Sequence, residues 1–284
     1  MILERARAKV NLTLRVLGRR TDGYHEIDSL IAFAGDAFDL LSLDPGAPTG
    51  VTVSGPFAGH IVGENIVATA LRRLAEMAPE LTLGAVQIDK RLPVAAGIGG
   101  GSANAGALLR ALAATNLDNA ADIDWLELAA SLGADVPVCF VGQPCRVTGL
   151  GERLEPLPRL PSLNAVLVNS LAKVPADKTA RVFRQLTAPA MSESIPVTPA
   201  PGLENSEALL KTMSEIGNDL EPPARRAFPE IADVLDTLHA TNGCRFAAMS
   251  GAGPTCFGIF DDHQEAAANI ASRHPDWWVQ PSRI

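Results

Sequence analysis

The chain has 284 residues, of which 47% are hydrophobic and 20% charged. This length can form one large domain or two ordinary ones, each with its own core. No apolar run approaches the roughly 18 residues of a membrane span, and residues 1–10 lack the apolar segment of a signal peptide, so we expect a cytoplasmic protein. The net charge of −8 disfavours nucleic acid as a partner, because a phosphate backbone attracts basic surfaces.

The cysteines and histidines give no sign of a metal site. The four cysteines contain no C-x-x-C pair, and the five histidines are scattered along the chain. We therefore predict buried free thiols rather than disulfides or a zinc site. No carboxylate pair in the sequence identifies ligands for another metal ion.

The chain begins with a predicted hairpin. Apolar and polar residues alternate strictly over residues 9–16, which is typical of a strand with one buried face. Lys9 and Asn11 fall on the polar face, where a strand lysine is usually solvated. Asp22-Gly23 is a turn signal, and the apolar residues after it predict the second strand.

A helix and a strand are predicted next. Residues 65–77 carry an apolar face at helical spacing that includes Met77, and Asn65 before them is a plausible N-cap. Residues 85–94 predict a strand, and a helix of small and apolar residues is expected from Ser102 onward.

A second helix and strand are predicted before the middle of the chain. The helix over residues 125–133 stops at Gly133, and residues 134–142 predict a buried strand. Asp135 stands at the entrance of that strand, where an aspartate can serve simply as a cap or turn residue.

Prolines mark a change of composition after residue 150. We predict a boundary between residues 153 and 154, which gives domains 1–153 and 154–284. Residues 188–202 hold four prolines and are typical of a long mobile loop. The elements predicted beyond residue 160 are a strand over 165–170, a helix over 231–243, two strands joined by a glycine turn within 245–260, and a helix over 263–274.

Residues 93–106, PVAAGIGGGSANAG, concentrate glycine between a predicted strand and a predicted helix. Glycine lets backbone N–H groups approach a ligand, and a helix start adds unpaired N–H groups and a partial positive charge, so this unit suits phosphate. Neither the P-loop, which needs a lysine after its second glycine, nor the G-x-G-x-x-G spacing fits. From spacing alone, a glycine-rich turn packed closely on a neighbour stays an alternative, and SGAGP at 250–254 is likewise a common hairpin loop.

Several segments together resemble one kinase superfamily. PVAAGIGGGSA is similar to the ATP-binding motif of the galactokinase, homoserine kinase, mevalonate kinase and phosphomevalonate kinase (GHMP) superfamily, and MSGAGPTCFGIF resembles its glycine-rich C-terminal motif. The segments ARAKVNLTLRVLGRRTDGYHEIDSL, LGADVPVCF and GNDLEPPARRAFPEI resemble a narrower branch, whose members phosphorylate a cytidine diphosphate sugar-alcohol in the non-mevalonate (methylerythritol phosphate) route to isoprenoids. The resemblance runs in the expected order from about residue 6 to about residue 260.

This resemblance implies an α+β fold of two domains, with the active site in the cleft between them. The N-terminal domain would be mixed α/β and the C-terminal domain ferredoxin-like α/β. The implied reaction transfers the γ-phosphate of ATP, in the presence of Mg²⁺, to a hydroxyl of a small molecule. The residues implied for ATP are Pro93, Ala95, Ala96, Gly97, Ile98, Gly99, Gly100, Gly101, Ser102, Ala103, Asn65 and Asn104.

The resemblance also assigns the catalytic residues. Asp135 matches the catalytic aspartate and would accept the proton of the substrate's 2-hydroxyl. Lys9 would hold Asp135 ionised and stabilise the developing alkoxide, since an opposite charge within about 4–6 Å favours an ionised carboxylate. Asn11 would orient the same region. Ala103, where many members carry a second serine, and the residues Ala252-Gly253-Pro254, where the turn often holds serine or threonine, are departures that touch neither Lys9 nor Asp135.

Cytosine recognition is implied near the first turn. Tyr24 and His25 would read and stack the base, with Phe183 as the partner aromatic and Thr179 as a further substrate contact. Stacking of a base on an aromatic ring is worth about 1–3 kcal/mol. For Phe183, packing in the core at helical spacing stays an alternative.

Other functions stay open. The nearest is a sister kinase for homoserine or mevalonate, against which the stretch DGYHE argues. A non-catalytic nucleotide-binding protein is another, and the presence of both Lys9 and Asp135 argues against it. A nicotinamide-dependent oxidoreductase is disfavoured by the glycine spacing. The sequence leaves the oligomeric state open.

Overall fold

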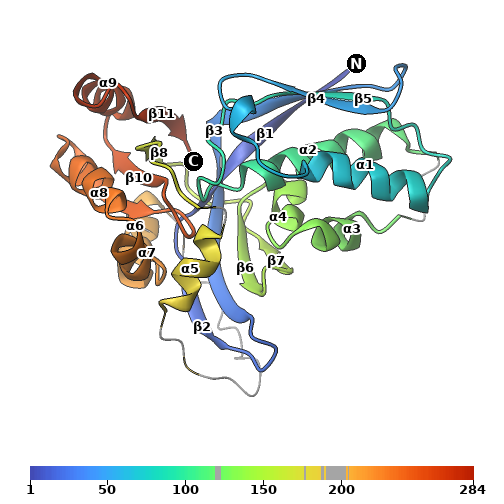
Figure 1. Ribbon diagram of the computed structural model, residues 1–284. Coiled ribbons are helices and arrows are strands. Elements are labelled where there is room, and N and C mark those ends of the chain that lie inside the picture. Colours follow the sequence, from blue (N-terminus) through green and yellow to red (C-terminus); the bar gives the residue numbers. More distant parts are fainter. Residues whose placement is uncertain (119–122, 176, 187–188, 190–202, 204) are drawn as a thin grey trace. The chain divides into compact units, whose positions relative to one another are not determined.

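The computed structural model describes residues 1–118, 123–175, 177–186, 189, 203 and 205–284 (Figure 1). Strands and helices are mixed along the chain, as expected for the α+β class. The predicted loop over 188–202 lies outside the described residues except for Pro189. Among the helices of these ranges, none has the length and hydrophobicity needed to span a bilayer.

The chain forms two compact units, and each is assembled from separate stretches of sequence. Residues 1–8, 37–94 and 99–142 form the first unit, and residues 9–36, 95–98 and 143–284 form the second. The strands β1 (Ile2–Asn11) and β3 (His25–Asp44), which pair with each other, therefore contribute residues to both units. The expected boundary between residues 153 and 154 does not coincide with this division. The domains 1–153 and 154–284, and a cleft between them, stay predictions.

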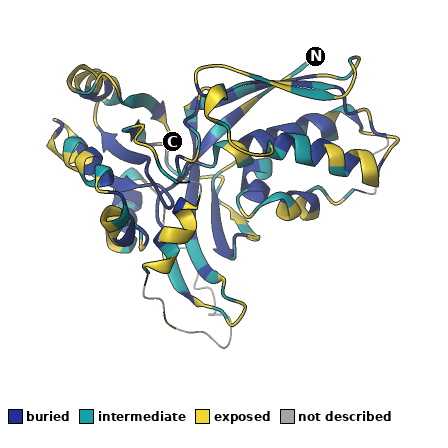
Figure 2. Ribbon diagram, in the orientation of Figure 1, coloured by how far each residue is buried: buried dark blue, intermediate teal, exposed yellow. Residues whose placement is uncertain are grey.

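In the first unit, the last residues of β3 pair antiparallel with β5, which pairs in parallel with β4. Helix α1 begins after Asn65, whose Oδ1 accepts a hydrogen bond from Val67 N at 2.9 Å, so the predicted N-cap is confirmed. Helix α2 is buried over most of its length (Figure 2). The elements of this unit not yet delimited are β4 (Gly50–Ser54), the short 3-10 helix η1 (Ala58–His60), α1 (Ile66–Met77), β5 (Ala85–Asp89), α2 (Gly100–Thr115), α3 (Trp125–Leu132) and α4 (Val136–Val141).

In the second unit, β2 (Arg15–Arg19) and the first part of β3 form the predicted hairpin. Its turn is closed by a hydrogen bond from Arg20 N to Tyr24 O of 2.8 Å, and Asp22 Oδ1 accepts another from Tyr24 N at 3.1 Å. The strand β6 (Cys145–Gly149) pairs with the same part of β3 and with β7 (Arg153–Pro156).

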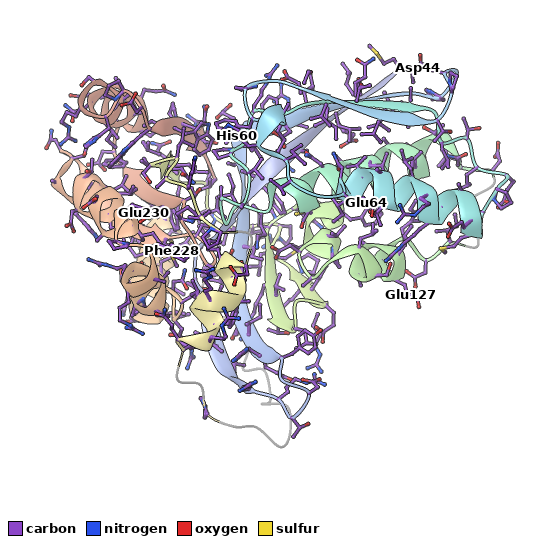
Figure 3. All side chains as sticks on the ribbon, viewed as in Figure 1. Asp44, His60, Glu64, Glu127, Phe228 and Glu230 are labelled. Atoms are coloured by element: carbon purple, nitrogen blue, oxygen red, sulfur yellow. The ribbon has the colours of Figure 1, made fainter. Side chains whose placement is uncertain are left out.

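The C-terminal residues form an antiparallel sheet in the order β11-β8-β10-β9. Helices α8 and α9 cover one face of it, and Phe228, labelled in Figure 3 near the start of α8, belongs to the same core. With α8 and α9 in the helix positions, the succession β-α-β-β-α-β confirms the ferredoxin-like expectation. The elements are β8 (Asn164–Asn169), α5 (Lys178–Arg184), α6 (Ser206–Ile216), α7 (Glu221–Ala227), α8 (Glu230–Ala240), β9 (Cys244–Met249), β10 (Cys256–Phe260), α9 (His263–Arg273) and β11 (Trp278–Arg283).

The predicted strand over residues 134–142 is wrong, because Val136–Val141 form helix α4. Pro137 lies in the first turn of this helix, where its missing N–H costs nothing. Gly142, with φ 65°, ends the helix in the left-handed conformation. Packing of α4 against α2 outweighs the preference of valine for strands.

The prediction of a strand over 9–16 with one solvated face is also wrong. The strand β1 ends at Asn11, and Lys9, Asn11 and Thr13 on the polar face are buried together with the apolar face. Alternation reports which side chains point the same way, but it does not report whether a distant segment covers them.

Smaller differences concern element ends and one side chain. The strand β5 stops at Asp89, and α2 begins at Gly100, two residues before the predicted start. Met77 is 62% exposed although its spacing placed it on the apolar face of α1.

Candidate active site

The glycine loop, residues 93–99, leads from the end of β5 into α2. Ala95, Gly97 and Gly99 have positive φ values of 56°, 78° and 65°, so the chain turns sharply at alternate residues. Gly99 occupies the N-cap position of α2 and has no side chain with which to cap it. The first N–H groups of a long buried helix are thus left for another acceptor, the arrangement that binds anions at helix N-termini.

In the second unit, residues 95–98 of the loop pack against the glycine turn, residues 250–254, between β9 and β10. A Cβ atom built on Gly97 would overlap the carbonyl oxygen of Gly253 and lie 2.9 Å from that of Ser250. Thr255 N donates to Ala96 O at 3.0 Å, and Ser250 Oγ donates to Gly97 O at 3.3 Å. The two glycine-rich motifs of the sequence are therefore in contact at Gly97, and this close packing requires glycine there.

In the first unit, α4 holds Asp135 in place through its contact with α2. A Cβ atom on Gly106 would lie 2.6 Å from the carbonyl carbon of Cys139, so glycine allows the two helix backbones to meet. Arg110 of α2 donates to Cys139 O at 2.6 Å and pairs with Glu4 at 2.8 Å. Asp135 occupies the N-cap position of α4, but its side chain accepts no capping hydrogen bond from that helix. Its role as a simple cap is thus not supported.

A buried ion pair between Lys90 and Asp39 lies next to the start of α2. Lys90 Nζ pairs with Asp39, and both side chains are at most 4% exposed. Asp39 Oδ1 also accepts hydrogen bonds from the backbone N–H groups of Arg91 at 2.7 Å and Leu92 at 2.8 Å. A Cβ atom on Gly100 would lie 3.0 Å from Lys90 Nζ, so the ammonium group lies directly against the first residue of α2.

Lys9 and Asn11 lie beside the glycine loop in the second unit. Lys9 N donates to Ile98 O at 2.9 Å, and its side chain is buried. Asn11 Nδ2 donates to Ser29 Oγ at 2.8 Å, while its Oδ1 is buried without a hydrogen-bond partner among the described residues. Because a buried polar atom normally has a partner, Asn11 Oδ1 is suited to a donor on a ligand. Lys9 belongs to the second unit and Asp135 to the first, so their expected meeting stays a prediction.

The residues expected to bind cytosine include a ring pair in the second unit. The rings of His25 and Phe183 are 4.9 Å apart between centroids and inclined by 31°. Burial, and after it the charge of Arg19, lowers the pKa of His25, which favours the neutral imidazole that stacks on a base. Tyr24 is 65% exposed, and Thr179 is also exposed. Phe183 is only partly buried, so it keeps surface for a ligand.

The remaining residues expected at ATP have mixed surroundings. Asn65 Oδ1 is used by the cap of α1, which leaves its amide nitrogen for another role. Asn104 Oδ1 is buried in α2 and has no hydrogen-bond partner among the described residues. Ala103 is buried and Ser102 half-buried in the first turn of α2.

Lys178 is a candidate site residue that the sequence did not reveal. It lies at the first position of α5, is 4% exposed, and donates from Nζ to the carbonyl oxygen of Gly253. Burial, and after it the charge of Lys9, lowers its pKa to about 8. The one signal in the sequence is helical spacing, because Lys178 shares a buried face with Val182 four residues later.

Two family models and a solved structure match this chain. The family model for the N-terminal domain of GHMP kinases matches residues 65–143, and the model for their C-terminal part matches residues 200–280. Homoserine kinase from Cytophaga hutchinsonii has the same fold, with a TM-score of 0.66 at 18% identity over 99% of this chain and 93% of that one. Together with the glycine loop, these matches define a GHMP kinase.

Two proteins with higher sequence identity to this chain identify its family within the GHMP kinases. The chain is 47% identical, over 99% of its length and 96% of the relative's, to 4-diphosphocytidyl-2-C-methyl-D-erythritol kinase of Rhodopseudomonas palustris. A crystal structure of 4-(cytidine 5′-diphospho)-2C-methyl-D-erythritol kinase matches with a TM-score of 0.75 at 34% identity over 99% of both chains. Within the GHMP kinases, the chain belongs to the family of 4-diphosphocytidyl-2-C-methyl-D-erythritol kinases.

Proposed function

We propose that the protein transfers the γ-phosphate of ATP to the 2-hydroxyl of 4-diphosphocytidyl-2-C-methyl-D-erythritol, in the methylerythritol phosphate route to isoprenoid precursors. The names of the relatives indicate this substrate. The structural observation that carries the proposal is the contact between His25 and Phe183 in the unit that also holds Lys9. A planar base needs such aromatic surface, whereas homoserine and mevalonate have no ring to stack.

In the proposed mechanism, Asp135 accepts the proton of the 2-hydroxyl while Lys9 stabilises the charge that develops on the oxygen. Asn11 orients the substrate through its buried Oδ1. ATP supplies the phosphoryl group when it is bound. The phosphates of ATP would be held by the glycine loop and by the N–H groups at the start of α2. The buried Oδ1 of Asn104 would accept a hydrogen bond from the nucleotide.

Magnesium is proposed to arrive with ATP. Mg²⁺ usually keeps several waters and binds through one or two carboxylates together with substrate phosphates. In the part of the chain that the structure describes, no group of three or more His, Cys, Asp or Glu side chains could hold a metal ion. The donor set therefore fits an ion held mainly by nucleotide phosphates and water. A cytoplasmic location and the absence of a nucleic-acid partner stay predictions. The oligomeric state stays open.

The experiment that tests the function is release of ADP from purified protein with ATP and Mg²⁺, with each candidate alcohol in turn. Turnover with 4-diphosphocytidyl-2-C-methyl-D-erythritol and none with homoserine or mevalonate is expected. The position of the new phosphate follows from ³¹P–¹³C coupling in the product, because the carbon that bears the 2-hydroxyl carries no hydrogen. Turnover with another alcohol would refute the assignment of Tyr24, His25 and Phe183, and no turnover with any of them would favour the non-catalytic nucleotide-binding protein.

A further inference from the structure

Lys178 is a second buried lysine in the unit that also holds Lys9. Its Nζ donates to Gly253 O, the same carbonyl that a side chain on Gly97 would overlap. The group therefore lies where the glycine turn meets the glycine loop. Within the described residues, its partner is this neutral carbonyl, with no ion pair to a carboxylate.

The surroundings of Lys178 favour an anionic ligand. A buried charge is costly unless it is paired, and a second positive charge nearby raises that cost. Lys9 is near enough for its charge to act on Lys178. On α7, which packs against α5, Glu221 pairs with Arg225 at 3.7 Å and accepts a hydrogen bond from Met249 N. The other charged side chains here are Arg226 on α7, Arg181 and Arg184 on α5, and Asp177 at the N-cap of α5. Asp177 pairs with both Arg181 and Arg184.

Helix α5 carries both this ammonium group and the aromatic contact for the base. Phe183, which touches His25, follows Lys178 by five residues, so the two positions are separated by about 7.5 Å along the helix axis. A cytidine diphosphate extends from its base through ribose to two phosphates, a span of similar size. The two positions also lie about 140° apart around the helix axis, so a ligand that contacts both side chains crosses the surface of α5.

We infer that Lys178 binds the diphosphate of the cytidine substrate and so selects a diphosphate-bearing alcohol over a neutral one. This inference rests on the proposed function and deepens it. Lys9 acts at the hydroxyl that is phosphorylated, whereas Lys178 acts on a group that is charged before the reaction begins. Its contribution is therefore expected in the binding of substrate rather than in the chemical step.

Binding of cytidine and CDP, measured by calorimetry with the ATP site filled by a non-hydrolysable ATP analogue, tests the inference. The wild type should bind CDP at least tenfold more tightly than cytidine. Lys178→Met should lose at least tenfold in affinity for CDP and keep its affinity for cytidine within twofold. Lys211→Met, which removes an exposed lysine of α6, should bind both as the wild type does.

A pH series separates charge from shape. CDP affinity of the wild type should fall above pH 8, where Lys178 loses its proton, and Lys178→Arg should hold its affinity through pH 9.5 because guanidinium stays charged. This comparison also serves if Lys178→Met does not fold. In turnover, Lys178→Met should raise KM for the cytidine substrate at least tenfold and change KM for ATP and kcat less than threefold.

The failures can be told apart. A wild type that binds CDP no better than cytidine contradicts the proposed substrate class itself. A wild type that prefers CDP, with Lys178→Met keeping the full preference, overturns only the role of Lys178. A fall in kcat with unchanged KM also overturns it, since Lys178 would then act in the transition state.

Discussion

Asp135 stands at the N-cap of α4 without capping it, whereas Asp124 at the N-cap of α3 accepts hydrogen bonds from Leu126 N and Glu127 N. The two aspartates thus form a matched pair. Asp135→Asn should lower kcat by about 10²–10⁴, the usual worth of a general base. Asp124→Asn should keep activity within twofold, because asparagine caps helices as well as aspartate does. ADP release and urea unfolding measure both effects, and equal activities would remove Asp135 from the mechanism.

Lys178 also gives the stability of the protein a predicted pH dependence. Its pKa is about 8 in the folded protein and 10.5 as a free side chain, so between these pH values the unfolded chain binds more protons than the folded one. The free energy of unfolding then rises with pH through this group, by on the order of 3 kcal/mol in all. Lys178→Met should therefore be more stable than the wild type at pH 7, and the difference should shrink towards pH 10. Urea unfolding at the two pH values tests this, and a constant difference would contradict it.

At the scale of elements, the glycine loop and the glycine turn are predicted to depend on Gly97. Gly97→Ala puts a side chain at φ 78° and against Gly253 O, so the free energy of unfolding should fall by about 1–3 kcal/mol, and KM for ATP should rise. Gly101→Ala is the control for stability. Gly101 lies in α2, and a Cβ atom there would meet only Ile66 Cγ2, at 3.8 Å. Because alanine favours a helix over glycine, this substitution should raise the free energy of unfolding by about 0.5–1 kcal/mol. Equal urea midpoints for the two variants would refute the contact as described.

The elements that could be predicted from sequence are those whose signals are local. Asn65 caps α1, Gly133 ends α3, and the glycine turn joins two strands, because each depends on residues a few positions apart. Helix α4 could not be predicted, since a six-residue apolar run fits a buried helix as well as a strand, and its contact with Gly106 decides between them. Burial of Lys9, and the position of Lys178, depend on segments distant in sequence. The assignment of Lys9 and Asp135 came from resemblance, not from spacing.

At the scale of the whole molecule, the two compact units are interleaved in sequence. Leu14 belongs to the core formed by α7, α8 and the C-terminal sheet, so a fragment of residues 1–153 lacks the residues against which Leu14 packs. We expect a fragment of residues 1–153 to show no cooperative unfolding transition in urea, whereas the full chain unfolds cooperatively. Circular dichroism of both measures this. A cooperative transition in the fragment would show that the boundary predicted after residue 153 separates independent folding domains.

The same interleaving has a consequence for synthesis on the ribosome. Within the second unit, residues 9–36 are made first, but the unit is completed only with residues 143–284. At 5–20 residues per second, the interval before residue 143 emerges is about 5–20 s. An isolated two-stranded hairpin is marginally stable at best, so the apolar side chains of β2 and β3 are open to contact with other chains during that time. Substitutions of apolar residues in the hairpin, away from Tyr24 and His25, should therefore reduce the yield of folded enzyme in the cell more than the turnover of the molecules that do fold.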